Sequence, residues 1–375
     1  MASGDENPDS IAGDEKSQPI AGAAKSEPFA GDPKPGSNGG AALDTLTRPL
    51  RDALSEARAE SLPVAVAVSG GADSVMLAVH AAAVTRDLGI PLHLLHVHHG
   101  LFEQADDWAD AVCRLGDALQ VPVHVLRVQV AAGDGKGVEA AARQARYAAL
   151  AQAAAGLGLC HILLAHHRDD QAETVLLRLL RGAGPAGLAA MSPRAERDGV
   201  VYLRPWLDIP RAVIREAAAA YATGHGWMPV QDPSNSDERY TRAALRNLLV
   251  PALDARWPGW QAIVARHARL AEEAAQILDE VASDDLAGLE PSALGDSFSL
   301  APWRQLSPAR QAQVLRYWLA RQGARMPTEA RLAELLKQLR QLHSLGHDRH
   351  LVWNHARHCV RCVRGRVSVE PREDG

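Results

Sequence analysis

The sequence predicts an α/β fold, in which a parallel sheet with helices on both faces is followed by a mostly helical C-terminal domain. Short apolar runs alternate four times with segments of helical spacing. The glycine-rich and polar motifs fall directly after the apolar runs. Because ligands bind at the carboxyl ends of the strands in such sheets, the same pattern predicts where the functional site lies.

The elements of the sheet domain are expected in strict alternation. Strands are expected at residues 64–68, 92–97, 121–128 and 161–165. Helices are expected between and after them, at residues 74–87, 104–119, 138–155 and 169–181.

Composition indicates a globular protein with room for two domains. The chain has 375 residues, of which 47% are apolar and 23% charged. It has no run of about 20 apolar residues, and Met1–Asp9 carries acids where a signal peptide needs a basic and then an apolar stretch. Four cysteines are too few for a disulfide scaffold. We therefore expect a cytoplasmic protein without membrane contact.

Three regions differ in composition and charge. Residues 1–43 have few apolar side chains to bury and are expected to be disordered. Residues 44–255 are expected to form the catalytic domain, and residues 256–375 a helical domain. Residues 301–375 hold 14 Lys and Arg against 6 Asp and Glu, so this part is electropositive. Such a surface suits a polyanion, although a solvated helix surface explains it equally well.

A glycine-rich loop follows the first expected strand. Ser69-Gly-Gly-Ala-Asp-Ser74 opens a helix, whose first N–H groups and partial positive charge favour an anion such as phosphate. No lysine follows the glycines, so this is not the common GxxxxGK nucleotide loop. Asp73 beside a phosphate suits a bridging divalent cation. A plain strand-to-helix turn is the alternative.

The densest polar cluster follows the fourth expected strand. In Ala165-His-His-Arg-Asp-Asp-Gln-Ala-Glu-Thr174, Asp170 and Glu173 lie three residues apart and share one face of a helix. Such carboxylates can hold Mg²⁺, recognise an ammonium group or take a proton from an attacking amine. Acids in a first turn also stabilise the helix dipole, which is the plainer explanation for one of them.

Two weaker signals lie elsewhere in the expected domain. Arg143 and Arg146 share a helix face, where a guanidinium can meet a phosphate or a developing oxyanion. His96-Val-His-His99 ends the second expected strand and suits either nucleotide contact or packing.

The loop resembles the SGGxDS signature of the N-type ATP pyrophosphatases. Other segments narrow the resemblance to the bacterial tRNA(Ile)-lysidine synthetases over residues 60 to 255. These segments are His96–Leu101, Arg143–Tyr147, Ala165–Thr174, Arg181–Leu188, Arg204–Trp206 and Asp232–Asn235.

The resemblance implies a two-step ligation with ATP and Mg²⁺. The C2 oxygen of the wobble cytidine in a tRNA(Ile) with a CAU anticodon would be adenylated. The side-chain amine of L-lysine would then displace AMP and form lysidine. The basic C-terminal domain would dock the tRNA, and a homodimer is a possible assembly.

The resemblance also assigns roles to individual residues. Asp73 would bind the metal and act in catalysis, Arg143 would assist adenylation, and Asp170 and Glu173 would act in catalysis and bind lysine. Further substrate contacts would come from His166, Arg242 and Arg246. ATP would be held by the loop residues Ser69, Gly70, Gly71, Ala72, Asp73 and Ser74. For His166, packing at the strand end is the alternative.

One departure from the family pattern falls in the segment of the two arginines. Family members have Arg-Asn-x-x-Arg where this chain reads Arg242-Ala-Ala-Leu-Arg246. Both arginines are retained, so the substrate contact that the resemblance assigns to them is only partly put in question by Ala243.

Two other functions remain open at this point. tRNA 2-thiocytidine synthetases share the loop but need cysteines near the site, and residues 60–255 hold no Cys-x-x-Cys pair. A binding module without catalysis would not be expected to keep Asp73, Asp170 and Glu173. A zinc site at Cys359-Val-Arg-Cys362 lacks a second cysteine pair, and the alternation in residues 359–367 favours a hairpin.

Overall fold

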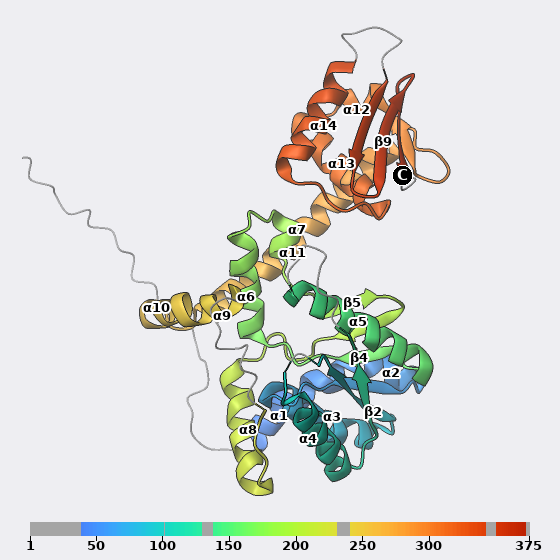
Figure 1. The fold of residues 1–375 in the computed structure, drawn as a ribbon. Coiled ribbons are helices and arrows are strands. Elements are labelled where there is room, and N and C mark those ends of the chain that lie inside the picture. Colours follow the sequence, from blue (N-terminus) through green and yellow to red (C-terminus); the bar gives the residue numbers. More distant parts are fainter. Residues whose placement is uncertain (1–38, 101, 130–137, 231–240, 343–349, 373–375) are drawn as a thin grey trace, which may run out of the picture. The chain divides into compact units, whose positions relative to one another are not determined.

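The computed structural model describes residues 39–100, 102–129, 138–230, 241–342 and 350–372 (Figure 1). Most of the tail expected to be disordered, residues 1–38, lies outside the described residues. Helix α1 (Gly39–Ala53) includes the last five residues of that expected tail. It is anchored from Leu46 onward, because Leu46 and Leu50 are buried in the core.

The predicted catalytic domain, residues 44–255, is built on a six-stranded sheet in the order β3-β2-β1-β4-β6-β5. All neighbouring pairs are parallel except β5 with β6. The strands are β1 (Val64–Ala67), β2 (Leu92–His98), β3 (Val123–Arg127), β4 (His161–Leu163), β5 (Arg194–Arg197) and β6 (Val200–Leu203). The four expected strands are confirmed, whereas β5 and β6 were not anticipated.

The four expected helices are also present, within two residues of their predicted limits. They are α3 (Ala72–Leu88), α4 (Ala105–Leu119), α5 (Val138–Leu157) and α6 (Arg168–Leu179). The domain also contains the helices α2 (Ser55–Glu60), α7 (Pro185–Leu188) and α8 (Arg211–His225).

Alternate side chains of the strands enter two separate cores. Val64 and Val66 of β1 pack with residues of α1, α3 and α8, whereas Ala65 between them packs with residues of α5 such as Leu150 and Ala154. This is the period-two pattern of a strand that is buried on both faces. The predicted parallel sheet with helices on both faces is therefore confirmed.

The order of the strands places a topological switch point at β1. From β1 the chain proceeds to β2 and β3 on one side, and then returns to β4 on the other side. In open α/β sheets, ligands bind at such a point, outside the carboxyl ends of the two strands. The segments after β1 and β4, which contain the loop and the acidic cluster, therefore meet here.

A run of helices begins inside the predicted catalytic domain, which ends at residue 255, and leads into the C-terminal domain. It consists of α9 (Thr241–Ala244), the π-helical turn η2 (Leu245–Leu249), α10 (Val250–Arg256) and α11 (Trp260–Ala287). The 28-residue helix α11 packs against α6 and α7 and also against a helix of the C-terminal domain, α13 (Pro308–Arg321).

The C-terminal domain combines helices with a small antiparallel sheet in the order β7-β10-β9-β8. Its elements are β7 (Ser297–Ser299), α12 (Leu300–Gln305), α13, α14 (Glu329–Gln341), β8 (Leu351–His355), β9 (His358–Val363) and β10 (Arg366–Pro371). The expected hairpin is confirmed, since Arg366 pairs with Val363 and Val367 with Cys362. The full sheet was not anticipated.

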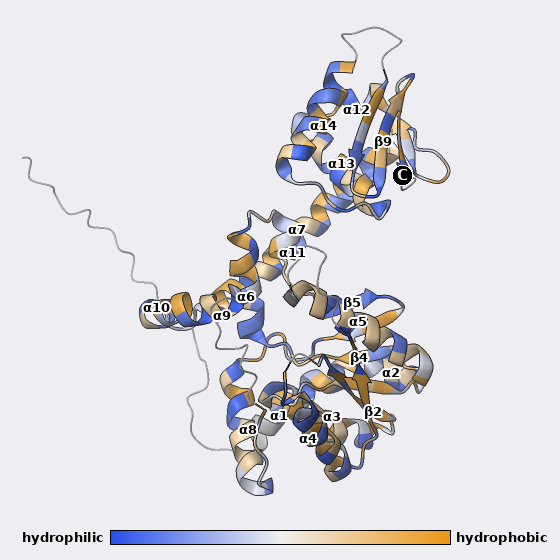
Figure 2. Cartoon of the chain, in the orientation of Figure 1, coloured by the Kyte–Doolittle hydropathy of each residue, from blue (hydrophilic) through white to orange (hydrophobic). Residues whose placement is uncertain are grey.

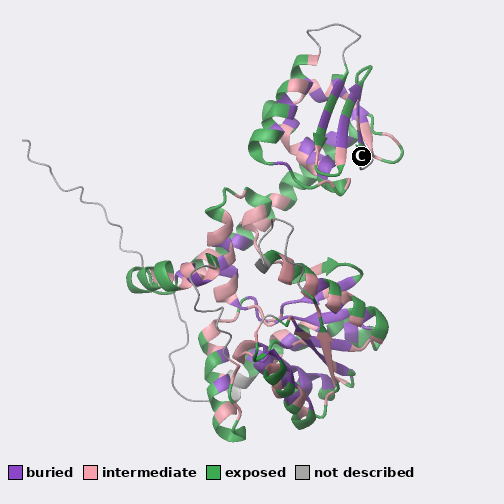
Figure 3. Cartoon of the chain, viewed as in Figure 1, coloured by how far each residue is buried: buried purple, intermediate pink, exposed green. Residues whose placement is uncertain are grey.

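The core of this domain is centred on the buried Phe298, Trp303 and Trp318. Figure 2 shows both hydrophobic and hydrophilic residues along α13 and α14, as expected for helices with one buried face. Figure 3 shows buried residues on strands of both sheets, such as β4 and β9, whereas β3 and β5 have none. Cys359 and Cys362 lie three residues apart in β9, so their thiols are on opposite faces of the strand and do not converge on one ion.

No helix in the described part of the chain is both long and apolar enough to cross a bilayer.

Candidate active site

The loop after β1 is held in shape by its own side chains. The hydroxyl of Ser74 accepts from the Ser69 N–H at 3.1 Å and donates to the Gly71 carbonyl at 3.0 Å. Gly70 has φ +91°, and a Cβ there would lie 2.9 Å from Val230 Cγ2, so both conformation and space require glycine. Gly71 is the N-cap of α3. The loop thus presents the amino end of a 17-residue helix, which favours a phosphate.

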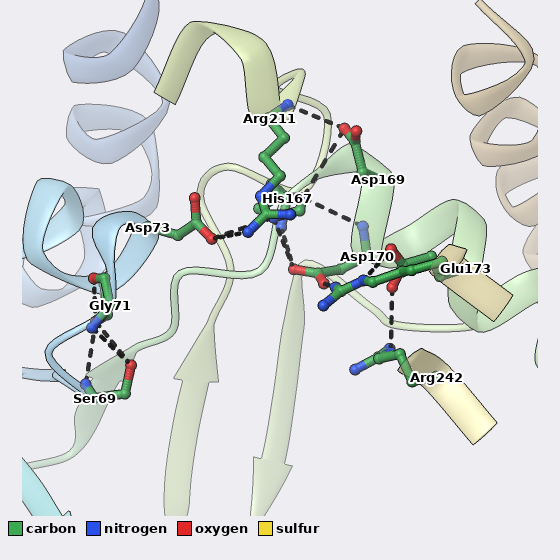
Figure 4. A network of polar contacts seen from close by, with 11 residues as sticks. Ser69, Gly71, Asp73, His167, Asp169, Asp170, Glu173, Arg211 and Arg242 are labelled. Atoms are coloured by element: carbon green, nitrogen blue, oxygen red, sulfur yellow. Dashed lines mark hydrogen bonds and ion pairs between the residues drawn. The ribbon is translucent and has the colours of Figure 1, made fainter. Parts of the chain in front are cut away.

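Asp73 lies in the first turn of α3 and points toward the start of α6 (Figure 4). Its Oδ2 lies 3.4 Å from Nη2 of Arg211 and 3.6 Å from Nε2 of His167. Burial alone would raise the pKa of Asp73, but the hydrogen bond from His167 and the charges of His167 and Arg211 outweigh it and lower the pKa. The carboxylate is therefore ionised, as a metal ligand must be.

His167 occupies the centre of the network (Figure 4). Its ring caps α6, because Nδ1 accepts from the Asp170 N–H at 3.2 Å while the Asp170 carboxylate accepts from the His167 N–H at 3.3 Å. Burial would lower the pKa of His167, but the hydrogen bond to Asp73 and the charges of Asp170, Asp73 and Asp169 raise it. The sequence indicated His166 as a site residue and gave no role to His167.

Asp170 and Glu173 come together as predicted, and Glu173 is paired with both predicted arginines, whereas Asp170 is paired with Arg246. Arg246 donates from Nε to Glu173 at 2.6 Å and from Nη2 to Asp170 at 3.2 Å. Arg242 lies 3.3 Å from Glu173 and donates to the Thr174 hydroxyl at 2.8 Å. Arg246 sits on the π-helical turn η2, a type of distortion that is frequent at functional sites.

A cavity of about 1020 Å³ opens beside these groups. It is lined by the loop, by His166 and by Arg246, but neither Asp170 nor Glu173 reaches its wall. Burial lowers the pKa of His166 to about 3, with Asp170 offsetting part of that effect, so this ring is neutral near pH 7. His96 lines the same cavity, and its Nδ1 bonds to the Val68 carbonyl at 2.8 Å.

The two arginines of α5 differ in position. Arg143 is exposed, lies 3.4 Å from the Tyr147 hydroxyl and is not part of the cavity wall. Arg146 lines the cavity, and no ion pair joins it to a carboxylate of the described residues. Burial lowers the pKa of Arg146, but an arginine remains charged. The structure therefore places Arg146, one turn further along, where the sequence analysis expected Arg143.

Arg211 is the second residue that the sequence analysis missed. Its side chain lines the cavity beside Asp73, and its backbone N–H donates to the Asp169 carboxylate at 3.0 Å. Asp169 thereby joins the start of α8 to the start of α6. Arg211 lies in none of the motifs that carried the resemblance, and only its place at the start of a basic helix segment would have indicated it.

Ala243, the departure from the family pattern, is buried in α9. Its side chain therefore makes no contact with the cavity, whose wall does not include it. The arginines on either side of it keep their contacts with the acidic pair.

Two family models match separate parts of the chain. A PP-loop domain matches residues 43–253, and a TilS substrate binding domain matches residues 298–368. The tRNA(Ile)-lysidine synthase of Bordetella parapertussis is 63% identical over 325 residues, which cover 87% of this chain and 94% of that protein. The chain belongs to the tRNA(Ile)-lysidine synthase family.

Other tRNA(Ile)-lysidine synthases differ in length. That of Bordetella pertussis is 65% identical over 82% of this chain and 95% of its own length. The Ralstonia nicotianae protein is 48% identical over 74% of this chain, which spans only 58% of that longer relative. The U34-tRNA thiolase NcsA from Methanococcus maripaludis, which was solved with its 4Fe-4S cluster, shares the fold with a TM-score of 0.52. That match has 16% identity and covers 62% of this chain and 81% of the thiolase.

Proposed function

We propose that this chain uses ATP to join the side-chain amine of L-lysine to C2 of the wobble cytidine in a tRNA(Ile) with a CAU anticodon, forming lysidine. The observation that carries the proposal is that one cavity is lined both by the nucleotide loop and by Arg246, the arginine that binds the acidic pair. Arg246 lines that cavity together with Asp73, and it holds Asp170 and Glu173 directly behind its wall.

The reaction would proceed in two displacements. The C2 oxygen of cytidine attacks the α-phosphorus of ATP, the bond to the β-phosphate breaks, and pyrophosphate leaves. The amine of lysine then attacks C2, and AMP leaves with the oxygen. The N–H groups at the start of α3 suit the phosphates, and Arg146 suits the negative charge that develops at the α-phosphate.

Asp170 and Glu173 are proposed to receive the lysine side chain. Two adjacent carboxylates attract an ammonium group, and one of them can take its proton before the amine attacks. Because Arg246 pairs with both carboxylates, the lysine ammonium would take its place. Arg242 and Arg246 would then be available to phosphates of the tRNA.

Asp73 is proposed to hold Mg²⁺. Its Oδ1 is buried and has no hydrogen-bond partner among the described residues, so the site has a donor atom available for a cation. The ion would neutralise charge on the phosphates of ATP. Removal of Mg²⁺ and the substitution Asp73→Asn should each abolish pyrophosphate release, and an Asp73→Asn enzyme with full activity would remove this assignment.

The C-terminal domain is proposed to dock the tRNA through its excess of arginine. Binding through phosphates weakens steeply with salt. The affinity of the full chain for tRNA, measured by filter binding at several salt concentrations, should therefore fall linearly on a log–log plot. An affinity that is insensitive to salt would exclude this role.

The decisive experiment is incorporation of radiolabelled lysine into a tRNA(Ile) transcript with a CAU anticodon. Incorporation that requires both ATP and this anticodon supports the proposal. Bound ATP without incorporation contradicts it, and the iron content would then test thiolation of a tRNA cytidine. Sedimentation at several protein concentrations tests the homodimer, and a cytoplasmic location stays a prediction.

A further inference from the structure

His167 lies between the two halves of the proposed reaction site. Its Nε2 is 3.6 Å from the Asp73 carboxylate, on the nucleotide side, and 3.3 Å from the Asp170 carboxylate, on the amino-acid side. The side chain is only 2% exposed, so the ring has little freedom to move away from either partner. We propose that His167 is a positioning residue that couples the two carboxylates, so that Mg-ATP and lysine each raise the affinity of the other.

The orientation of the ring follows from its cap. Because Nδ1 accepts the Asp170 N–H, a ring with one proton carries it on Nε2. Nε2 lies within 4 Å of both carboxylates, so the buried ring holds both of them in place. A ligand that orders Asp73 therefore also orders Asp170, and the second ligand then binds to a site that is already ordered.

Few polar contacts join these two segments in the part of the chain that the structure describes. The ladder between β1 and β4 ends at Val66 and Leu163, before either segment begins. Beyond it, the contact between His167 and Asp73 joins them directly. A second, indirect connection passes from Asp73 through Arg211 to Asp169.

The geometry also separates this role from simple capping. Capping uses Nδ1 and would be satisfied by any good N-cap residue, such as asparagine. Coupling uses Nε2, which faces the opposite way and lies beyond the reach of an asparagine side chain. The longer glutamine places an amide N–H near the Nε2 position but is a poor cap.

Two substitutions of this residue therefore test the inference, which rests on the function proposed above. The Kd of lysine is measured by calorimetry on the full chain, with and without Mg²⁺ and an ATP analogue that cannot be cleaved between the α and β phosphates. Thermal unfolding is measured on the same samples. In the unsubstituted protein the analogue should tighten lysine binding at least about fivefold, the lower end of ordinary coupling between sites.

The two variants should respond in opposite ways. His167→Asn should keep its Tm and lose the coupling, so that the analogue leaves the Kd of lysine unchanged. His167→Gln should unfold at a lower temperature and keep most of the coupling. In steady-state assays His167→Asn should raise the KM for lysine at saturating ATP, and His167→Gln should restore it.

Several results would overturn the inference. If the analogue still tightens lysine binding fully in His167→Asn, the inference is wrong. It is also wrong if coupling is lost in each variant only in proportion to the fall in its Tm. If the unsubstituted protein binds both ligands but neither affects the affinity of the other, the inference is wrong and the proposed function still stands. A protein that binds the analogue but never lysine would overturn the proposed function as well.

Discussion

Arg146 and Arg143 show how one helical turn decides which of two equivalent-looking side chains lines the cavity. Both lie on α5, but only Arg146 lines the cavity. A guanidinium that is partly withdrawn from water interacts strongly with charge that develops beside it, because the local dielectric is low.

We predict that Arg146→Ala lowers the rate of adenylation much more than Arg143→Ala does. Removal of one group that stabilises developing charge typically lowers kcat by about 100- to 1000-fold. Because Arg143 is exposed, Arg143→Ala should lower kcat by less than about tenfold. Release of pyrophosphate with tRNA and ATP measures this step without lysine. If Arg143→Ala lowers the rate of pyrophosphate release more than Arg146→Ala does, the role in adenylation belongs to Arg143.

His166 provides a test of burial through pH. Its folded-state pKa of about 3 lies below the ordinary value of 6.5, so between these values the unfolded chain binds a proton that the folded chain does not. Stability from this residue is therefore complete above pH 6.5 and is lost as the pH falls toward 3. The slope is at most about 1.4 kcal/mol per pH unit.

We predict that His166→Gln unfolds with a weaker dependence on pH between 6 and 4 than the unsubstituted protein. Urea unfolding at several pH values measures the difference in slope. Because other buried histidines, such as His80 and His96, titrate in both proteins, their contribution cancels in the comparison. Equal slopes would mean that the ring is accessible to water.

At the scale of elements, the loop after β1 depends on a backbone conformation as much as on its side chains. Gly70 is in the left-handed region and touches Val230, whose N–H binds the Gly70 carbonyl at 3.1 Å. Gly71 has φ −71°, and a Cβ there would meet only the Ser69 hydroxyl, at 3.6 Å.

We predict that Gly70→Ala raises the KM for ATP by about tenfold or more, whereas Gly71→Ala changes it little. A side chain in the left-handed region costs about 1–2 kcal/mol before the contact with Val230 is counted. Since Gly71→Ala keeps every backbone N–H and fits the available space, it is the matched control. Equal effects of both substitutions would show that this conformation is not what ATP requires.

At the scale of the whole molecule, the C-terminal domain has a hydrophobic core of its own. Residues from Leu286 to Val369 form one cluster, which has no member in common with the two cores of the catalytic domain. Asp285 at the end of α11 is buried and pairs with Arg310 of α13, which fixes this end of the helix in the domain.

A fragment of residues 281–375 is therefore expected to fold alone and to unfold cooperatively. Near-ultraviolet circular dichroism of the buried Trp303 and Trp318 reports its packing. Leu335→Ala in the fragment should lower the free energy of unfolding by about 2–5 kcal/mol, as for other buried leucines. A gradual transition without near-ultraviolet signal would show that the domain needs the rest of the chain.

The chain order of the catalytic domain could be predicted from the sequence, because buried strands and amphipathic helices have different apolar periods. The same local signals located the phosphate loop and the acidic pair. They missed β5, because Arg194-Ala-Glu-Arg197 is an exposed edge strand with neither alternation nor an apolar run. The small sheet was missed in part because the three-residue strand β7 is held by its pairing with β10.

The residue types of the site and the ends of the strands on which they lie can be predicted from short segments of the sequence. Which of these residues meet depends on contacts between distant segments. His167 reaches Asp73 because β4 pairs with β1, which precedes it by almost one hundred residues. Arg246 contacts Asp170 from a π-helical turn, and such a turn has no periodic signal in the sequence. Contacts of this kind depend on strand order and helix packing, which no local pattern encodes.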